Sequence, residues 1–225
     1  GLMFQLIDKA AKLGVMLELD CETDFVARNE EFQALGNGIC KLIAADAECD
    51  KGTEEEKIAN LLAKSYDGSN TVNDMLVGLI AKIGENMKIR HFARYTAEGN
   101  IYSYIHNTGK VGVMVELVGG TDGEALDQLG HDVCLHIAAA APSYLAPEDV
   151  PAEALEREKD IYRQQLIDEG KPADRVDKIL IGKMRKFYEL NCLLEQFWIK
   201  DDSVQIKKLL GNVKVARYVR YVIGN

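Results

Sequence analysis

The chain has 225 residues, a mass of 25.0 kDa and a net charge of -9. Its length allows a sizeable core in one large or two small domains, and its 47% hydrophobic and 28% charged residues are ordinary for a globular protein. The negative charge argues against a nucleic-acid binder, because such proteins neutralise phosphates with Lys and Arg. No apolar run approaches the roughly 20 residues that span a membrane.

The N-terminal stretch GLMFQLIDKAAK has no basic region followed by a long apolar run, so a signal peptide is not expected. It predicts a strand that starts abruptly, and we expect a further segment to precede it. The cysteines are odd in number and lack the CxxC spacing of a zinc site. We expect them to be buried, reduced thiols, with the protein in the cytoplasm or an organelle matrix. They are Cys21, Cys40, Cys49, Cys134 and Cys192.

A repeat organises the chain. KLGVMLELDCETD at residues 12–24 matches KVGVMVELVGGTD at 110–122, an offset of 98, and the same offset aligns residues 3–8 with 101–106. Two apolar strands joined by a short turn predict a β-hairpin in each copy. The second turn, at residues 106–110, carries more turn-forming residues than the first.

Each hairpin is followed by a predicted helix and a closing strand. Residues 36–45 match residues 130–139 at an offset of 94, so the first copy has four more residues between its Thr-Asp pair and its helix. Apolar residues four apart on both segments predict a helix face that meets a core. Strands near 89–96 and 213–223 then share an aromatic-x-Arg-Tyr motif.

These elements predict an α+β fold of two tandem repeated lobes, each a three-stranded antiparallel sheet packed on helices. The N-terminal lobe would span residues 1–99 and the C-terminal lobe residues 100–225. Apolar residues three, four and seven apart within 152–169 and 176–187 predict an antiparallel helical hairpin, or coiled coil, inserted at about 152–187. The short seams indicate an arm of which only the base packs on its lobe.

The stretch CETDFVARNEEF at residues 21–32 contains the extra residues of the first copy. A pair of large apolar residues, Phe25 and Val26, follows Thr23 and Asp24, where a strand end does not require them. A surface that inserts into a partner would. The plainer alternatives are a core or staple residue for Phe25 and a helix N-cap for Thr23 and Asp24, and a cap could also fix an inserting side chain.

No catalytic or nucleotide-binding motif stands out. The chain lacks GxxxxGK[ST] and G-x-S-x-G, and its two histidines five apart on a predicted helix, His131 and His136, lie on different faces. His106 lies in the second hairpin turn, where a plain exposed turn residue is the first interpretation and a partner contact the second. We therefore predict that the chain is not an enzyme and that it holds no cofactor or metal.

Several motifs in the right order resemble the translation elongation factor Ts family, from about Leu2 to Gly224. They are TDFVARNEEF, IGENMKIRHFARY, YIHNTGKVGVMVEL, and GKMRKFYELNCLLEQFWIKDD followed by VARYVRY. The resemblance implies a duplicated core with a protruding coiled coil. It also implies guanine-nucleotide exchange on elongation factor Tu, in its GDP-bound and nucleotide-free forms.

The resemblance implies that Thr23, Asp24, Phe25 and Val26 reach toward the partner's nucleotide site and dislodge magnesium. It further implies a small N-terminal helical domain that this sequence does not contain; either such a segment precedes it, or the chain is a divergent member that binds more weakly. The alternative function is a structural or scaffold protein of the translation machinery that retains the fold. The sequence leaves the stoichiometry open, including a dimer or a heterotetramer with the partner, and a purely structural arm is as compatible with it as a contacting one.

Overall fold

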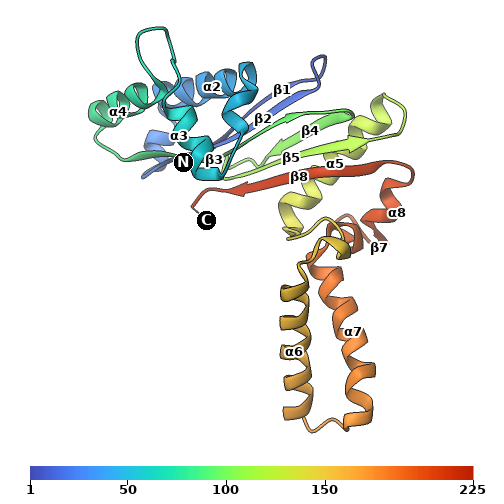
Figure 1. Ribbon diagram of the computed structural model, residues 1–225. Coiled ribbons are helices and arrows are strands. Elements are labelled where there is room, and N and C mark those ends of the chain that lie inside the picture. The colour runs from blue at the N-terminus through green and yellow to red at the C-terminus, as the bar shows by residue number, and fades with distance from the viewer. Residues whose placement is uncertain (225) are drawn as a thin grey trace. The chain divides into compact units, whose positions relative to one another are not determined.

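The computed structural model describes residues 1–224, and the side chains of all of these except 173 and 174. Its Cα atoms form two compact units (Figure 1). The sheet unit takes residues 1–138 and 213–224, and the arm unit takes Ala139–Asn212. The predicted division of the repeat into lobes at residue 99 is a different partition, and it stays a prediction.

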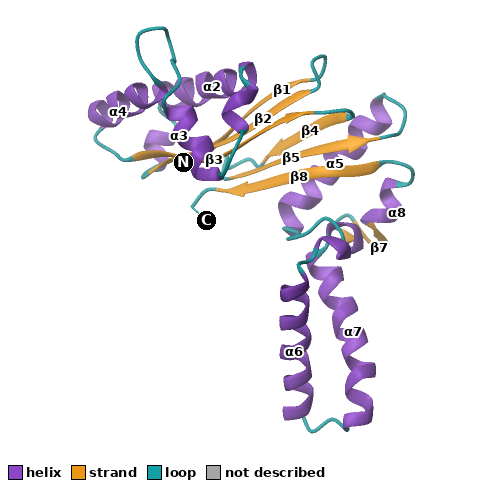
Figure 2. Ribbon diagram, viewed as in Figure 1, coloured by secondary structure: helices purple, strands orange, loops and turns teal. Residues whose placement is uncertain are grey.

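Two three-stranded antiparallel sheets form the centre of the sheet unit (Figure 2). The first has the order β1-β2-β3 and the second the order β4-β5-β8. The α+β class with a three-stranded sheet in each repeat is therefore confirmed. The strands are β1 Leu2–Asp8, β2 Leu13–Cys21, β3 Met87–Thr96, β4 Asn100–Ile105, β5 Val111–Val118 and β8 Lys214–Val222.

The strand registers reproduce the repeat. Gly14 of β2 pairs with Ile7, and Gly112 of β5, which is 98 residues further on, pairs with Ile105. Both middle strands also have an irregularity at the same place, between residues 18 and 19 and between 116 and 117. Because register follows the side-chain pattern of a half-buried strand, equal patterns give equal pairing.

Helices cover one face of each sheet. In the first repeat, α2 packs on β1 and β2 with a face of apolar residues spaced three and four apart, including Phe32 and Ile39. Asn29 caps this helix, since its side-chain oxygen accepts from the N–H groups of Glu31 and Phe32. The helices of the sheet unit are α1 Asp24–Ala27, α2 Glu30–Ala45, η1 Ala47–Asp50, α3 Glu54–Leu62, α4 Val72–Ile83 and most of α5 Glu124–Ala140.

The other faces of the two sheets meet in a shared cluster that includes Met16 and Met114. A Cβ atom on Gly14 would lie 2.7 Å from the sulfur of Met114, and one on Gly112 would lie 2.7 Å from the sulfur of Met16. Each glycine therefore leaves room for the methionine of the other repeat. This reciprocal contact explains why both copies of the hairpin contain Gly-Val-Met.

The arm unit contains the predicted helical hairpin. Its helices α6 (Ala152–Asp168) and α7 (Ala173–Asn191) are antiparallel and are joined at Gly170, whose φ of 70° suits glycine. The predicted helical hairpin is confirmed, and α7 continues to Asn191, four residues beyond the predicted end of the insertion. Leu180, Met184 and Phe187 of α7 belong to the core of this unit. The remaining elements are η2 Pro147–Asp149, η3 Leu193–Glu195, β6 Phe197–Trp198, β7 Asp201–Gln205 and α8 Ile206–Leu210. Across residues 1–224, no helix is long and apolar enough to cross a membrane.

Candidate functional site

The predicted segment Thr23–Val26 forms the corner between β2 and α2. Thr23 is the N-cap of the short helix α1, and its Oγ1 accepts a hydrogen bond from the Val26 N–H at 3.3 Å. The second repeat has no such helix between β5 and α5. The four extra residues inferred from the change of offset thus fall where α1 lies, and α1 distinguishes the first copy from the second.

Neighbouring side chains of α1 point in opposite directions. The Phe25 side chain is 87% exposed, the highest value among the exposed large hydrophobic residues, whereas Val26 is 5% exposed and belongs to the core of the first repeat. Phe25 is therefore neither a core nor a staple residue. Val26 instead anchors α1 in the core. The accessible part of the predicted segment consists of Thr23, Asp24 and Phe25.

The link between α4 and β3 holds the corner from one side. Glu85 accepts two hydrogen bonds from Thr23, from the backbone N–H to Oε2 at 3.0 Å and from the hydroxyl to Oε1 at 2.7 Å. The adjacent Asn86 donates from its side-chain amide to Glu22 at 2.7 Å. Gly84 ends α4 with a φ of 84° and so turns the chain toward these contacts. Glu85 and Asn86 lie in the motif IGENMKIRHFARY, but their spacing in the sequence does not predict this contact with Thr23 and Glu22.

The turn of the second hairpin holds the corner from the other side. The Lys110 ammonium lies 2.6 Å from the Asp24 carboxylate and also donates to the Gly1 carbonyl at 3.2 Å. The Met3 N–H donates to the Gly109 carbonyl at 2.8 Å. The hydrogen bond and the charge of Lys110 keep the pKa of Asp24 below its ordinary value, so this exposed carboxyl group stays ionised at neutral pH.

His106 begins this same turn and is exposed. Its ring Nδ1 lies 3.0 Å from the Tyr104 hydroxyl, and its carbonyl accepts from the Gly109 N–H at 2.6 Å. The predicted contact residue His106 and the predicted segment at Asp24 are therefore joined through a single five-residue turn that ends at Lys110. Both regions were predicted from the sequence, but their proximity was not.

The corner exposes groups of several chemical kinds. It offers an exposed aromatic ring, an ionised carboxylate and a polar turn. Within residues 1–224, no group of three or more His, Cys, Asp or Glu residues is arranged to hold a metal ion. The thiol of Cys40 is buried in the core, and burial raises its pKa to about 12, which disfavours the reactive thiolate.

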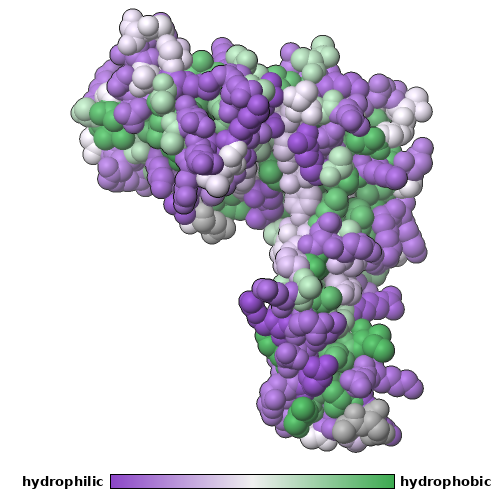
Figure 3. Space-filling model, in the orientation of Figure 1, coloured by the Kyte–Doolittle hydropathy of each residue, from purple (hydrophilic) through white to green (hydrophobic). Residues whose placement is uncertain are grey.

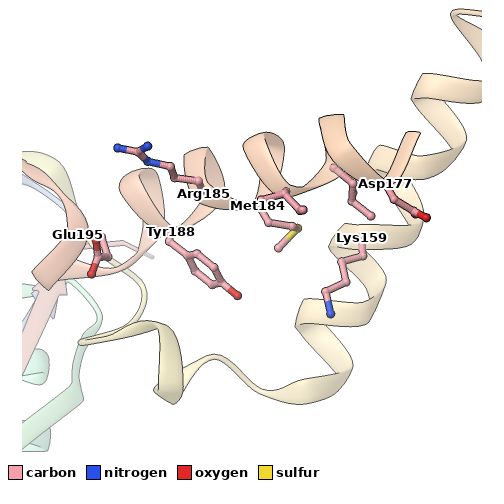
Figure 4. Close-up of a pocket in the computed structure, with 8 residues that line it drawn as sticks. Lys159, Asp177, Met184, Arg185, Tyr188 and Glu195 are labelled. Atoms are coloured by element: carbon pink, nitrogen blue, oxygen red, sulfur yellow. The ribbon is translucent and has the colours of Figure 1, made fainter. Parts of the chain in front are cut away.

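The arm unit has its own surface features. A pocket of about 390 Å³ opens between its helices, where Lys159 reaches from α6 and Met184 and Tyr188 from α7 (Figure 4). Apolar residues also reach the surface of the arm among charged ones (Figure 3), including Ile181, which is 71% exposed. These features suit contact with another surface but do not by themselves indicate what that surface is.

Comparison with known proteins gives consistent matches. A family model described as Elongation factor TS matches residues 22–225. The chain is 41% identical over 233 residues to "Elongation factor Ts" of Clostridium perfringens (strain SM101 / Type A), which covers 100% of this chain and 75% of the relative. It is 40% identical over 230 residues to "Elongation factor Ts" of Aquifex aeolicus (strain VF5), covering 100% of this chain and 79% of the relative. Since the family model spans most of the chain and these relatives cover all of it, the chain belongs to the elongation factor Ts family.

Proposed function

We propose that this chain is a guanine-nucleotide exchange factor that promotes release of GDP from elongation factor Tu during translation elongation. Thr23–Val26 would enter the region of the partner's nucleotide site and displace the magnesium ion. In this mechanism the chain makes and breaks no covalent bond, so it would act by binding and not as an enzyme. The proposal combines the family membership with the geometry of α1.

The observation that carries the proposal is the exposed ring of Phe25. A phenylalanine side chain in water forgoes about 1.5–3 kcal/mol that burial would supply. Here the ring is held outward on a helix of which the next residue, Val26, is anchored in the core. A partner pocket that accepts the ring would gain this free energy at low entropic cost, because the backbone is already ordered.

The mechanism follows from linkage. Bound GDP depends on magnesium to neutralise its phosphates, so displacement of the ion weakens the nucleotide. If the inserted segment lowers nucleotide affinity by a given factor, the nucleotide lowers the affinity of this chain by the same factor. Free GTP in excess then displaces the exchange factor, and the chain would bind both the GDP-bound and the nucleotide-free partner.

Two further contacts belong to the proposal. His106 would touch the partner beside the inserted segment, since its turn is tied to Asp24 through Lys110. The arm would make a second, separate contact through surfaces such as that around Ile181. The proposed complex would form in the compartment that houses translation, the cytoplasm or an organelle matrix, either as a simple pair or as a dimer of such pairs.

The test is release of labelled GDP from elongation factor Tu. The partner is loaded with fluorescent GDP, mixed with excess unlabelled nucleotide, and followed with and without this chain. We expect release to accelerate in proportion to the chain concentration until it saturates. A bound complex in a pull-down with no acceleration would instead support the scaffold alternative and overturn the exchange function.

A further inference from the structure

Glu85 binds Thr23 through two hydrogen bonds near the surface. One carboxylate receives both hydrogen-bond donors of Thr23, the backbone N–H at 3.0 Å and the hydroxyl at 2.7 Å. Hydrogen bonds to an ionised acceptor are shorter and stronger than those between neutral groups. Since both donors go to Glu85, the Thr23 backbone and its side-chain rotamer are fixed together.

The contact between Thr23 and Glu85 also orders the first turn of α1. With its hydroxyl hydrogen directed to Glu85, the Thr23 oxygen is free to accept the Val26 N–H at 3.3 Å. Val26 itself is held by the core. Phe25 lies between these two fixed residues, so its direction of exit from the surface depends on both.

A four-residue helix needs such external contacts. Isolated helices of this length are unstable in water, because nucleation orders several residues for very few backbone hydrogen bonds. In α1 the backbone bonds are few, for example Ala27 N–H to Thr23 O at 3.2 Å. The contacts that it makes with other elements must therefore supply much of its order.

Lys110 makes a second contact with α1 through Asp24 at 2.6 Å. In this pair the Asp24 side chain is 70% exposed and the Lys110 side chain 34%. Exposed ion pairs are screened by water and salt and contribute little. Glu85 binds both the backbone N–H and the hydroxyl of Thr23, whereas Lys110 binds α1 only through the side chain of Asp24, so Glu85 restrains the backbone of α1 more directly.

We propose that Glu85 is a positioning residue for nucleotide exchange: it would hold α1 so that Phe25 is presented to the partner in one orientation, with Lys110 as an auxiliary contact. This inference rests on the proposed function. It goes beyond that function because it gives a residue on the α4–β3 link an effect on the rate of nucleotide exchange. Glu85 lies 62 residues away from Thr23 in sequence.

The test uses two variants and a matched control. Glu85→Ala removes both acceptors, and Glu85→Gln keeps one carbonyl acceptor with the original shape. The control is Asp74→Asn, because Asp74 accepts from the N–H of Thr71 at 2.8 Å and from its hydroxyl at 2.7 Å. That pair has the same chemistry but caps the far end of α4, away from α1.

Two measurements are made on each variant. Amide hydrogen exchange by NMR reports order at Thr23 and Val26 in the free protein. Labelled GDP release, measured over a range of concentrations, separates the maximal rate from the half-saturating concentration. We expect Glu85→Ala to speed hydrogen exchange at the amides of Thr23 and Val26. We also expect it to lower the maximal rate of GDP release about three- to tenfold, with the half-saturating concentration changed less than twofold. Glu85→Gln should lie between it and wild type, and Asp74→Asn should release GDP like wild type.

Comparing the maximal rate of GDP release with the half-saturating concentration distinguishes a loss of positioning from a loss of folding. A partly unfolded variant has fewer active molecules, so it raises the half-saturating concentration and leaves the maximal rate intact. Unchanged amide exchange, or faster exchange with a normal maximal rate, would overturn the proposal. If Glu85→Ala does not fold, the result with Glu85→Gln decides, together with the result with Lys110→Met. The control for Lys110→Met is Lys9→Met, because Lys9 lies in the other hairpin turn and pairs with Asp127 of the other repeat at 3.1 Å. Failure of the proposed function is separate, because then the wild-type chain itself would not accelerate release.

Discussion

Replacement of Phe25 by alanine should separate exchange activity from stability. The side chain is 87% exposed, so its removal deletes few contacts of the folded state. We expect the free energy of unfolding to change by less than about 0.5 kcal/mol, as for surface substitutions in general. The matched control is Phe32→Ala, seven positions further on, where the ring is 0% exposed. Removal of a fully buried phenylalanine should cost about 3–5 kcal/mol.

The effect on exchange follows from the area that Phe25 would bury in the partner. Burial of a phenylalanine side chain is worth about 1.5–3 kcal/mol. If this contact forms only as the nucleotide leaves, its loss slows catalysed release by about 10- to 150-fold, since 1.4 kcal/mol corresponds to a factor of ten. Phe32→Ala should reduce activity only as far as it reduces the folded fraction.

The assay combines urea unfolding of each variant with labelled GDP release at saturating concentration. The expected pattern is a stable Phe25→Ala with strongly slowed release and an unstable Phe32→Ala whose folded molecules remain active. A Phe25→Ala variant that unfolds at clearly lower urea concentration yet stimulates release normally would refute the reasoning. In that case the ring would contribute to the fold, and its exposure would not indicate a contact with elongation factor Tu.

Three further predictions concern the rest of the chain. Deletion of residues 153–183 should leave the sheet unit folded, since the arm belongs to a separate compact unit; circular dichroism and thermal melting test this, and collapse of the remainder would contradict it. Glu18 is fully buried on β2, and burial together with the charge of Asp20 raises its pKa from 4.5 to about 7. The folded state therefore keeps this proton to higher pH than the unfolded chain does, and the group should reduce stability by about 2–3 kcal/mol as pH rises from 5 to 8. In urea unfolding, Glu18→Gln should lose correspondingly less stability between pH 5 and 8 than the wild type. A variant with the same pH dependence as the wild type would contradict the raised pKa of Glu18. Among the thiols, the partly exposed Cys21 should react with an aromatic disulfide reagent before the buried Cys40, whose pKa is raised to about 12, and peptide mapping that found the reverse order would contradict it.

Local pattern and repetition were enough to predict most of the fold. The offset of 98 identified both hairpins, and apolar residues three and four apart identified the helices of the arm. The change of offset to 94 marked the place of α1. These features depend on residues that are near one another in sequence, so hydrophobic periodicity and turn chemistry carry the information directly.

Other motifs were visible in the sequence without an assigned role. The aromatic-x-Arg-Tyr motif places an arginine near the end of a helix in both repeats. Arg94 donates to the carbonyls of Ile43 and Ala44 at the end of α2, and Arg220 donates to the carbonyl of Ala138 near the end of α5. Both arginines satisfy carbonyl groups that a helix end leaves without partners. The repetition of the motif indicated that it was important. Its role as a C-terminal cap could be recognised only once the packing of the strand against the helix was known.

The duplicated hairpins, the inserted arm and the position of one unmatched aromatic residue could all be read from the sequence, because each follows from short-range spacing. The outward direction of Phe25 and the inward direction of Val26 emerge only in the folded chain. The same is true of the contacts by which Glu85 and Lys110, 62 and 86 residues away from their partners, hold one short helix. The physical reason is that such contacts arise only when the sheets have paired and packed. Before folding, nothing in the spacing of these residues distinguishes them from any other glutamate or lysine at the surface.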